Sequence, residues 1–191
     1  MANYYAERAK EYERIYQKPE RQEELRQLRD LVQRTFADTH VLEIACGTGY
    51  WTEFIARSAV SVVATDINEE VLAIARSKPI DHQKTSFRTA DAYTLPPFPQ
   101  KFTAGLAAFW WSHVPRAKLR GFLEKFHRAV SPGGKVVFLD NCYVEGNSTH
   151  EVLKNFPTEP EVRETLASLA SEVHVQFLKY YWIVTYRTLS S

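Results

Sequence analysis

The sequence has few cysteines, almost no net charge and no long apolar segment. Cys46 and Cys142 are too few for a disulfide framework, so we expect two free thiols in a reducing compartment. A formal net charge of +1 provides no bulk electrostatic attraction to nucleic acid. No apolar segment approaches the roughly 20 residues that span a bilayer, so we expect no membrane partner.

The chain also lacks internal repeats, low-complexity tracts and the features of a signal peptide. Residues 1–17, MANYYAERAKEYERIYQ, are charged and rich in tyrosine, whereas a signal peptide contains an apolar segment. Hydrophobic residues make up 45% of the sequence and charged residues 25%, as in ordinary globular proteins. We therefore expect a single cytoplasmic domain of 191 residues, as a monomer or a homodimer.

Helical and strand patterns alternate along the chain. Apolar residues that recur every three or four positions predict helices at 3–17, 20–35, 49–58, 68–78, 115–130 and 158–170. Apolar or β-branched runs predict strands at 40–45, 61–66, 85–91, 102–110 and 135–141, and two more within 173–189. This alternation predicts an α/β fold with a mainly parallel sheet and helices on both faces.

Local signals refine this prediction. The two strands within 173–189 have almost no chain between them, so they must be antiparallel. Proline and glycine predict loops at 93–101 and 131–135. Asn68 is placed to cap the helix that follows it, and Thr158 and Glu161 have the spacing of a capping box. Ligands of open parallel sheets bind at the carboxyl ends of the strands.

The segment VLEIACGTGYWT, residues 41–52, indicates a ligand-binding loop between a strand and a helix. A phosphate-binding P-loop is excluded because no lysine follows the glycines. A dinucleotide fingerprint is incomplete because Thr52 stands where its third glycine belongs. A nucleoside with an amino-acid tail fits better, since Glu43 suits an ammonium group and a helix N-terminus suits a carboxylate.

This segment resembles motif I of the class I S-adenosylmethionine-dependent methyltransferases, in their small-molecule form. The resemblance extends over residues 40–141. It implies a Rossmann-like sheet of seven strands with a reversed last strand, with S-adenosylmethionine as cofactor and S-adenosylhomocysteine as product. It also implies a helical lid at 1–36, a donor-binding core at 37–141, and a shortened acceptor region with the last helix and hairpin at 142–191.

The resemblance implies a set of cofactor-binding residues at the ends of successive strands. They are Glu43, Ala45, Gly47, Gly49, Asp66, Ile67, Asp91, Ala92 and Phe109. The glycine backbone would approach the methionine portion, and Glu43 would lie near its amino end. Asp66 would accept from the ribose hydroxyls, and Ile67 would pack on the adenine. Asp91 would take the adenine amino group, next to the backbone N–H of Ala92, while Phe109 would line the methionine.

Candidate acceptor residues come from the N-terminal helix and from the segments after the fourth and fifth strands. The lining candidates are Tyr5, Tyr12, Tyr16, Trp110, Trp111, Asn141 and Tyr143. An aromatic lining suits a planar or apolar acceptor, although the same side chains could simply pack the helix onto the sheet. His113 is the candidate general base; the alternative is a histidine that hydrogen-bonds locally before Pro115.

Two other kinds of methyltransferase fit less well. Asp140 and Asn141 resemble the fifth-strand pair of magnesium-dependent enzymes, but Trp110, Trp111 and Ser112 supply no carboxylate after the fourth strand, so we expect no metal. Nucleic-acid methylation lacks its Asn/Asp-Pro-Pro-aromatic tetrad, and the cations of 116–128 suit a solvated helix face.

The sequence therefore predicts an enzyme that transfers a methyl group to a small aromatic or apolar acceptor at O, N or S. The acceptor segment at 142–157 is short for this family, which leaves the acceptor undetermined. Three alternatives stay open: a protein that binds S-adenosylmethionine with weak or lost transferase activity, a nucleic-acid methyltransferase, and a nicotinamide-dependent oxidoreductase.

Overall fold

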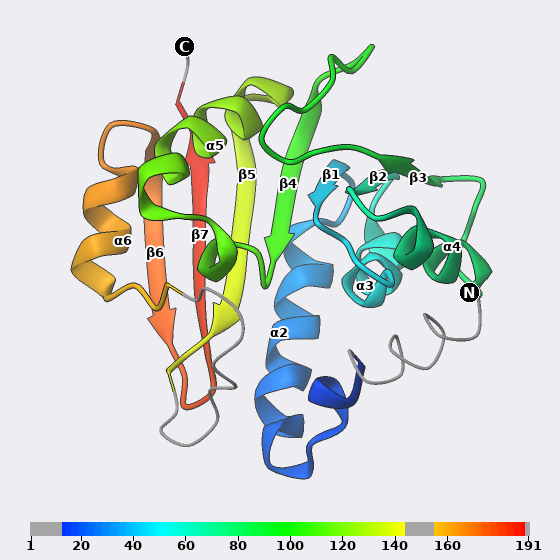
Figure 1. Ribbon diagram of the computed structural model, residues 1–191, viewed down its shortest axis with the longest axis horizontal. Coiled ribbons are helices and arrows are strands. Elements are labelled where there is room, and N and C mark those ends of the chain that lie inside the picture. The colour runs from blue at the N-terminus through cyan, green and yellow to red at the C-terminus, as the bar shows by residue number, and fades with distance from the viewer. Residues whose placement is uncertain (1–12, 144–154, 190–191) are drawn as a thin grey trace. The chain divides into compact units, whose positions relative to one another are not determined.

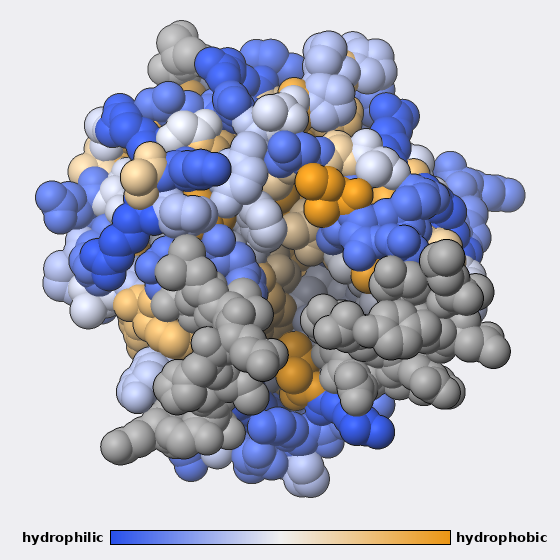
Figure 2. Space-filling model, viewed as in Figure 1, coloured by the Kyte–Doolittle hydropathy of each residue, from blue (hydrophilic) through white to orange (hydrophobic). Residues whose placement is uncertain are grey.

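The computed structural model describes residues 13–143 and 155–189 (Figure 1). The chain forms two compact units, Met1–Ala92 and Tyr93–Ser191. Cys46 and Cys142 are free thiols, as expected. Within the described ranges, no helix has both the length and the apolar character needed to cross a membrane. Among the coloured residues of Figure 2, hydrophilic ones predominate, and apolar ones form small, separate areas.

The first unit contains three parallel strands in the order β3-β2-β1. They are β1 (His40–Ile44), β2 (Ser61–Asp66) and β3 (Thr85–Thr89). The helices of this unit are α2 (Gln22–Thr35), α3 (Tyr50–Ser58) and α4 (Glu69–Ser77), and the 3-10 turns η1 (Ile15–Gln17) and η2 (Pro19–Arg21) precede α2. Consecutive side chains of β1 and β2 are buried, as expected of strands covered on both faces.

Helix α2 forms where the apolar spacing predicts it. Leu25, Leu28, Val32 and Phe36 recur at helical spacing and are all buried, with at most 1% of their surface exposed. Each such side chain contributes about 1.5–3 kcal/mol by leaving water. Helix α4 also begins as predicted, because the Asn68 side chain accepts a 3.0 Å hydrogen bond from the Glu70 backbone N–H.

The second unit contains four strands in the order β4-β5-β7-β6. They are β4 (Phe102–Ala108), β5 (Val130–Asn141), β6 (Ala170–Phe177) and β7 (Tyr181–Thr188). Strand β7 is antiparallel to both of its neighbours, so the C-terminal hairpin is confirmed. Helix α5 (Arg116–Ala129) contacts β5, and α6 (Glu159–Leu166) contacts β6 (Figure 1).

The predicted loop at 131–135 is wrong, because these residues belong to β5. Phe102 of β4 is paired with Val130, but Ala104 is paired with Lys135, so two steps along β4 match five along β5. The extra residues form a bulge in which Gly133 has φ +74°. A Cβ on Gly134 would lie 2.5 Å from a methyl carbon of Val130. The glycines therefore make an irregular strand rather than end one.

Helix α6 begins as predicted and ends earlier than predicted. The capping box is present: the Thr158 backbone N–H donates to Glu161 Oε2 at 2.7 Å, and the Thr158 hydroxyl accepts from the Glu161 N–H at 3.5 Å. The helix stops at Leu166 instead of residue 170, because Ala170 already pairs with Thr188 in the hairpin. Strand pairing thus overrides a sequence that is locally suited to a helix.

The predicted fold class is confirmed as a Rossmann-like α/β fold with seven strands and a C-terminal antiparallel hairpin. The predicted helix at 3–17 lies largely outside the described residues. Its described end is helical at 13–14 and continues as η1.

Candidate donor and acceptor sites

The loop between β1 and α3 has an unusual backbone. Ala45, Gly47 and Gly49 have φ values of 53°, 55° and 76°, all in the left-handed region. Glycine takes this conformation without a steric penalty, whereas Ala45 adopts it at a cost of about 1 kcal/mol. Gly49 is also required by packing, because an added Cβ would lie 3.0 Å from Ala75 Cβ on α4. The loop geometry therefore depends on its glycines.

Backbone hydrogen bonds hold this loop at the end of the strands. Cys46 N–H donates to Thr65 O at 2.9 Å, which extends the pairing of β1 with β2. Gly49 N–H donates to Cys46 O at 3.0 Å and so closes the turn. Within residues 13–143 and 155–189, and apart from the chain neighbours of Gly47, no atom lies within 4 Å of the position that a Cβ on this residue would occupy. This open space allows a ligand to approach the loop backbone.

Asp66, the last residue of β2, faces the loop. Its Oδ2 accepts a hydrogen bond from Gly47 N–H at 2.9 Å, and its Oδ1 accepts one from Asn68 N–H at 2.9 Å. Each carboxylate oxygen retains capacity for a further donor, such as a ligand hydroxyl. The next residue, Ile67, has 69% of its surface exposed, which leaves an apolar side chain beside the carboxylate.

Glu43 lies within the protein core rather than on the open side of the loop. It is 1% exposed, and its Oε2 accepts a 2.6 Å hydrogen bond from the Thr52 hydroxyl on α3. Burial raises the pKa of Glu43 to about 8, and this effect outweighs the opposing influences of Thr52 and Lys78. The group is therefore mostly protonated at neutral pH. Its predicted contact with an ammonium group remains a prediction.

The end of β3 lies beside Asp66. Ala90 N–H donates to Asp66 O at 2.9 Å, so the following residues, Asp91 and Ala92, come next to the end of β2. Asp91 is half-buried, and Ala92 is 8% exposed. The structure thus brings the predicted donor residues of three strand ends together in the first unit. Their contacts with a donor remain predictions.

Some residues at this site were missed by the sequence analysis. Glu13 Oε1 accepts a 2.7 Å hydrogen bond from the Thr48 hydroxyl and also pairs with Lys78. Neither contact has a local sequence signal, because 35 and 65 residues separate the partners. Tyr16 was predicted to line the acceptor. Its ring stacks on Tyr50, the first residue of α3, with ring centroids 3.6 Å apart. Tyr5 and Tyr12 lie outside the described residues.

In the second unit, His113 lies on a fixed turn. It ends the 3-10 turn η3 (Trp111–His113) after β4 and is half-buried. The buried Asp140 of β5 accepts hydrogen bonds from Ser112 N–H at 2.9 Å and from the Ser112 hydroxyl at 3.1 Å. It also accepts from Asn141 N–H at 2.7 Å. Burial raises the pKa of Asp140, against these hydrogen bonds and the nearby charge of His113.

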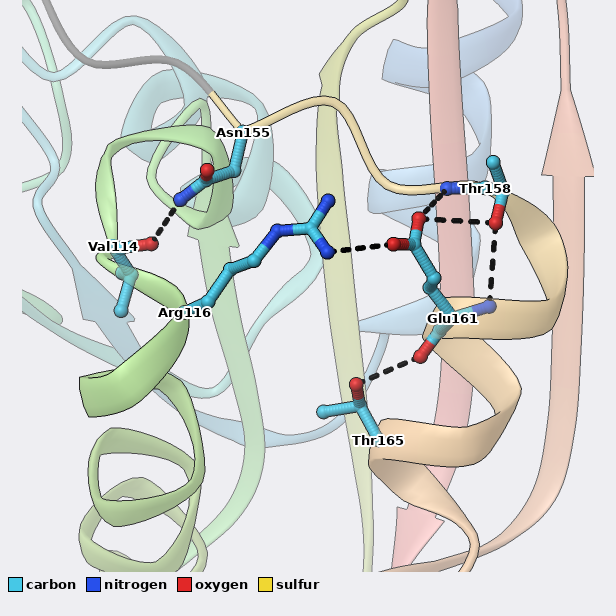
Figure 3. A network of polar contacts seen from close by, with 6 residues as sticks. All are labelled: Val114, Arg116, Asn155, Thr158, Glu161 and Thr165. Carbon is cyan, nitrogen blue, oxygen red and sulfur yellow. Dashed lines mark hydrogen bonds and ion pairs between the residues drawn. The ribbon is translucent and has the colours of Figure 1, made fainter.

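The chain before α6 holds the same turn from another direction. Asn155 N–H donates to Ser112 O at 2.7 Å. Figure 3 shows the side-chain amide of Asn155, which donates to Val114 O at 2.7 Å. Arg116 pairs with Glu161 at 2.7 Å across the same region. A cavity of about 260 Å³ opens here, and its lining includes Trp111, Val114, Asn155 and Glu161. Trp111 and Val114, which flank the Ser112–His113 pair, thus line this space, whereas His113 itself is not among its lining residues.

The predicted aromatic lining is divided between core and surface. Trp111 is 3% exposed and packs edge-to-face on Phe138 and Trp182, so most of this side chain belongs to the core. Trp110 is half-buried and packs on other aromatic rings. Tyr143 is 61% exposed.

The other predicted residues of this unit lie at strand ends. Phe109 follows β4 with φ 54°, and its N–H donates to Leu139 O at 2.7 Å. Asn141 ends β5 and is half-buried. Among the described residues, no group of three or more His, Cys, Asp or Glu side chains is placed to hold a metal ion. The oxygens of Asp140 are occupied by the N–H and O–H donors of Ser112 and Asn141.

Comparison with known proteins gives related sequences and folds. A family described as "Methyltransferase domain" matches residues 41–134. The demethylmenaquinone methyltransferase of Tropheryma whipplei (strain Twist) is 34% identical over 102 residues, which cover 53% of this chain and 41% of that protein. The ubiquinone/menaquinone biosynthesis C-methyltransferase UbiE of Rickettsia typhi is 28% identical over 141 residues, covering 68% and 56%. The match thus spans about half the length of these curated relatives.

Two solved structures match over nearly their whole length. A DhpI–SAH complex is 27% identical with a TM-score of 0.83, and the match covers 100% of this chain and 96% of that one. A DhpI–SAM–HEP complex is 28% identical with a TM-score of 0.79, and the match covers 97% and 94%. DhpI therefore has nearly the length of this chain.

Proposed function

Because the chain belongs to the class I S-adenosylmethionine-dependent methyltransferases, we propose that it transfers the methyl group of S-adenosylmethionine to a small-molecule acceptor. The observation that carries this proposal is the loop of Ala45–Gly49, which has left-handed backbone at three positions and is tied to Asp66. DhpI, solved with SAH and with SAM, supports the choice of donor.

The donor would occupy the open side of this loop. Gly47 leaves room for the methionine portion to approach the backbone. The Asp66 carboxylate, already oriented by two backbone donors, would accept from the ribose hydroxyls. The exposed Ile67 would be covered by the adenine, and Asp91 would accept from the adenine amino group. Burial of Ile67 would itself favour binding, because it removes apolar surface from water.

The transfer would be an in-line displacement at the methyl carbon. The acceptor atom forms a bond to this carbon while the bond to sulfur breaks, so the sulfonium becomes a neutral thioether. Positioning contributes much of the rate enhancement. If the acceptor is a hydroxyl, its proton must leave, and we assign this step to His113. The hydrogen bonds of Asp140 and Asn155 to neighbouring residues would keep that imidazole in place.

We infer an aromatic or apolar acceptor that is methylated at O, N or S. The cavity beside His113 supports a small molecule, since its lining combines Trp111, Val114 and Leu119 with polar groups. The relatives named as quinone-pathway methyltransferases match about half their length, so their acceptors are candidates to test. The near-equal length of DhpI supports a compact acceptor region without a long insertion.

A screen with methyl-labelled S-adenosylmethionine tests the proposal. The acceptors would be phenols, amines, thiols, carboxylates and a demethylated quinol. We expect at least one class to become labelled, with release of an equal amount of S-adenosylhomocysteine. Tight donor binding without transfer to any class would instead indicate a binding protein.

A further inference from the structure

Glu13 joins three parts of the first unit at the glycine loop. Its Oε1 accepts a 2.7 Å hydrogen bond from the hydroxyl of Thr48, which lies between Gly47 and Gly49. The same oxygen accepts from the ammonium group of Lys78, the residue that follows α4. One carboxylate oxygen thus ties the segment before η1 to the middle of the loop and to the end of α4.

This ion pair is partly shielded from water. The side chains of Lys78 and Glu13 are 18% and 30% exposed, whereas most ion pairs of the described chain are considerably more exposed. Shielded charges act more strongly on their surroundings than solvated ones. Lys78 also lowers the pKa of Glu43, so its charge interacts with a group near the end of β1. The charge of Lys78 therefore acts on the groups around the donor loop.

A second contact holds the same segment on the loop. Tyr16 follows Glu13 by three residues, a spacing that places both on one side of a helical turn. Its ring lies parallel to the ring of Tyr50, within 4° and with centroids 3.6 Å apart. Arg29 fixes Tyr50 by donating to its hydroxyl oxygen at 2.9 and 2.6 Å. Glu13 is therefore presented to Thr48 by a segment that Tyr16 anchors to the first residue of α3.

The donor and the product of methyl transfer differ by one positive charge, because the sulfonium of S-adenosylmethionine becomes a neutral thioether. Pairing with Glu13 offsets part of the positive charge of Lys78 at the loop. Without its partner, Lys78 would repel the sulfonium but not the thioether. We propose that Glu13 is a positioning residue whose ion pair with Lys78 allows the loop to bind the charged donor in preference to its product. This inference rests on the proposed function.

Three substitutions separate the charge of Glu13 from its structural contact. Glu13→Gln keeps an oxygen that can accept from Thr48 and removes the charge. Lys78→Met removes the opposite charge, and Thr48→Val removes the hydroxyl alone. Glu20→Gln, an exposed glutamate on η2, is the matched control for charge. Isothermal titration calorimetry at low salt would give Kd for S-adenosylmethionine and for S-adenosylhomocysteine with each variant.

The readout is the ratio of the two Kd values, because a purely structural change alters both by the same factor. We expect Glu13→Gln to weaken the binding of S-adenosylmethionine about three- to tenfold more than the binding of S-adenosylhomocysteine. Salt at 1 M should suppress this difference. Lys78→Met should shift the ratio in the opposite direction. The double variant should return it to the wild-type ratio, and Thr48→Val should leave it unchanged.

Equal weakening of donor and product by Glu13→Gln would overturn the proposal, as would a shift in the same direction by Lys78→Met. If Glu13→Gln fails to fold, as judged by circular dichroism, Lys78→Met alone still decides the outcome, because the proposal requires it to favour the donor over the product. A wild-type protein that binds neither ligand would refute the proposed function itself, which is a different result.

Discussion

The backbone N–H of Gly47 donates a 2.9 Å hydrogen bond to Oδ2 of Asp66, so the first glycine of the loop and the last residue of β2 are directly connected. Asp66 thereby has two roles. It holds the loop in its left-handed conformation, and it presents its remaining acceptor capacity to the ribose.

Asp66→Ala should therefore weaken the binding of S-adenosylhomocysteine by about 10- to 100-fold. This range corresponds to about 1.5–3 kcal/mol for hydrogen bonds to a charged group. Calorimetry on the folded variant measures the effect, and Asp30→Ala on the exposed face of α2 is the control. Wild-type affinity in folded Asp66→Ala would remove this residue from the donor site.

Gly49→Ala should destabilise the protein by about 1–3 kcal/mol. The residue has φ +76°, and its new Cβ would lie 3.0 Å from Ala75 Cβ, so strain and a close contact add together. Gly121→Ala is the matched control, because Gly121 is exposed within α5 and, beyond its own helix, no atom of the described part of the chain lies within 4 Å of an added Cβ. That change should stabilise by about 0.5–1 kcal/mol. Urea denaturation of both variants measures their free energies of unfolding. A Gly49→Ala variant as stable as the wild type would show that the loop does not require glycine at this position.

Glu43 should make the stability of the apoprotein depend on pH. Its pKa is about 8 in the folded protein, against 4.5 for an unperturbed glutamate, so the folded state retains a proton that the unfolded state has lost. The contribution of Glu43 is fully present below pH 4.5 and is lost as the pH rises to about 8.

Glu43→Gln removes this titration and keeps an oxygen that can accept from Thr52. The variant should be more stable than the wild type by about 3–5 kcal/mol at pH 8.5, with little difference near pH 4.5. Denaturant titrations across this range measure the difference. Parallel stability curves for the two proteins would show that Glu43 is ionised in the folded state.

His113→Ala tests the assignment of the general base. With a hydroxyl acceptor, kcat should fall by about 10² to 10⁴, while the affinity for S-adenosylhomocysteine stays close to that of the wild type. His174→Ala, an exposed position on β6, should leave both quantities unchanged. Loss of donor binding together with activity would mean that His113 belongs to the donor site or to the framework.

Methyl transfer should survive chelation. Asp140 is buried, and its two oxygens already accept hydrogen bonds from Ser112 and Asn141, so they are poorly available to a divalent cation. Activity should be the same in EDTA as in Mg²⁺. A rate that disappears with EDTA and returns with Mg²⁺ would reverse this expectation.

Local patterns in the sequence predicted the elements that depend on neighbouring residues. The stripe on α2, the cap at Asn68 and the turns at Gly47 and Gly49 each follow from a few consecutive positions. The bulge in β5 could not be predicted in this way, because its register is set by pairing with β4. For the same reason, the predicted end of α6 at residue 170 lies beyond its observed end at Leu166, because pairing within the hairpin begins at Ala170.

In the candidate site, too, the features set by neighbouring residues were predicted, and those set by tertiary contacts were not. The glycine loop and Asp66 could be selected from the sequence because their order resembles that of the methyltransferase family, and the structure joins them through the Gly47 N–H. That they bind the methyl donor stays a prediction. The contacts of Glu13 with Thr48 and Lys78 were missed, since only the tertiary fold brings them together. The core packing of Trp111 was also missed: its ring contacts Phe138 and Trp182, although the residue also lines the cavity next to η3.

The most direct test of the central claim is a thermal-shift measurement with S-adenosylmethionine, S-adenosylhomocysteine, NAD and ATP on the same preparation. We expect S-adenosylmethionine and S-adenosylhomocysteine both to stabilise the protein. At a concentration 100 times Kd, the gain is about 2.7 kcal/mol. NAD and ATP should produce no shift. Stabilisation by NAD, with no effect of S-adenosylmethionine or S-adenosylhomocysteine, would contradict the assignment of the loop to S-adenosylmethionine.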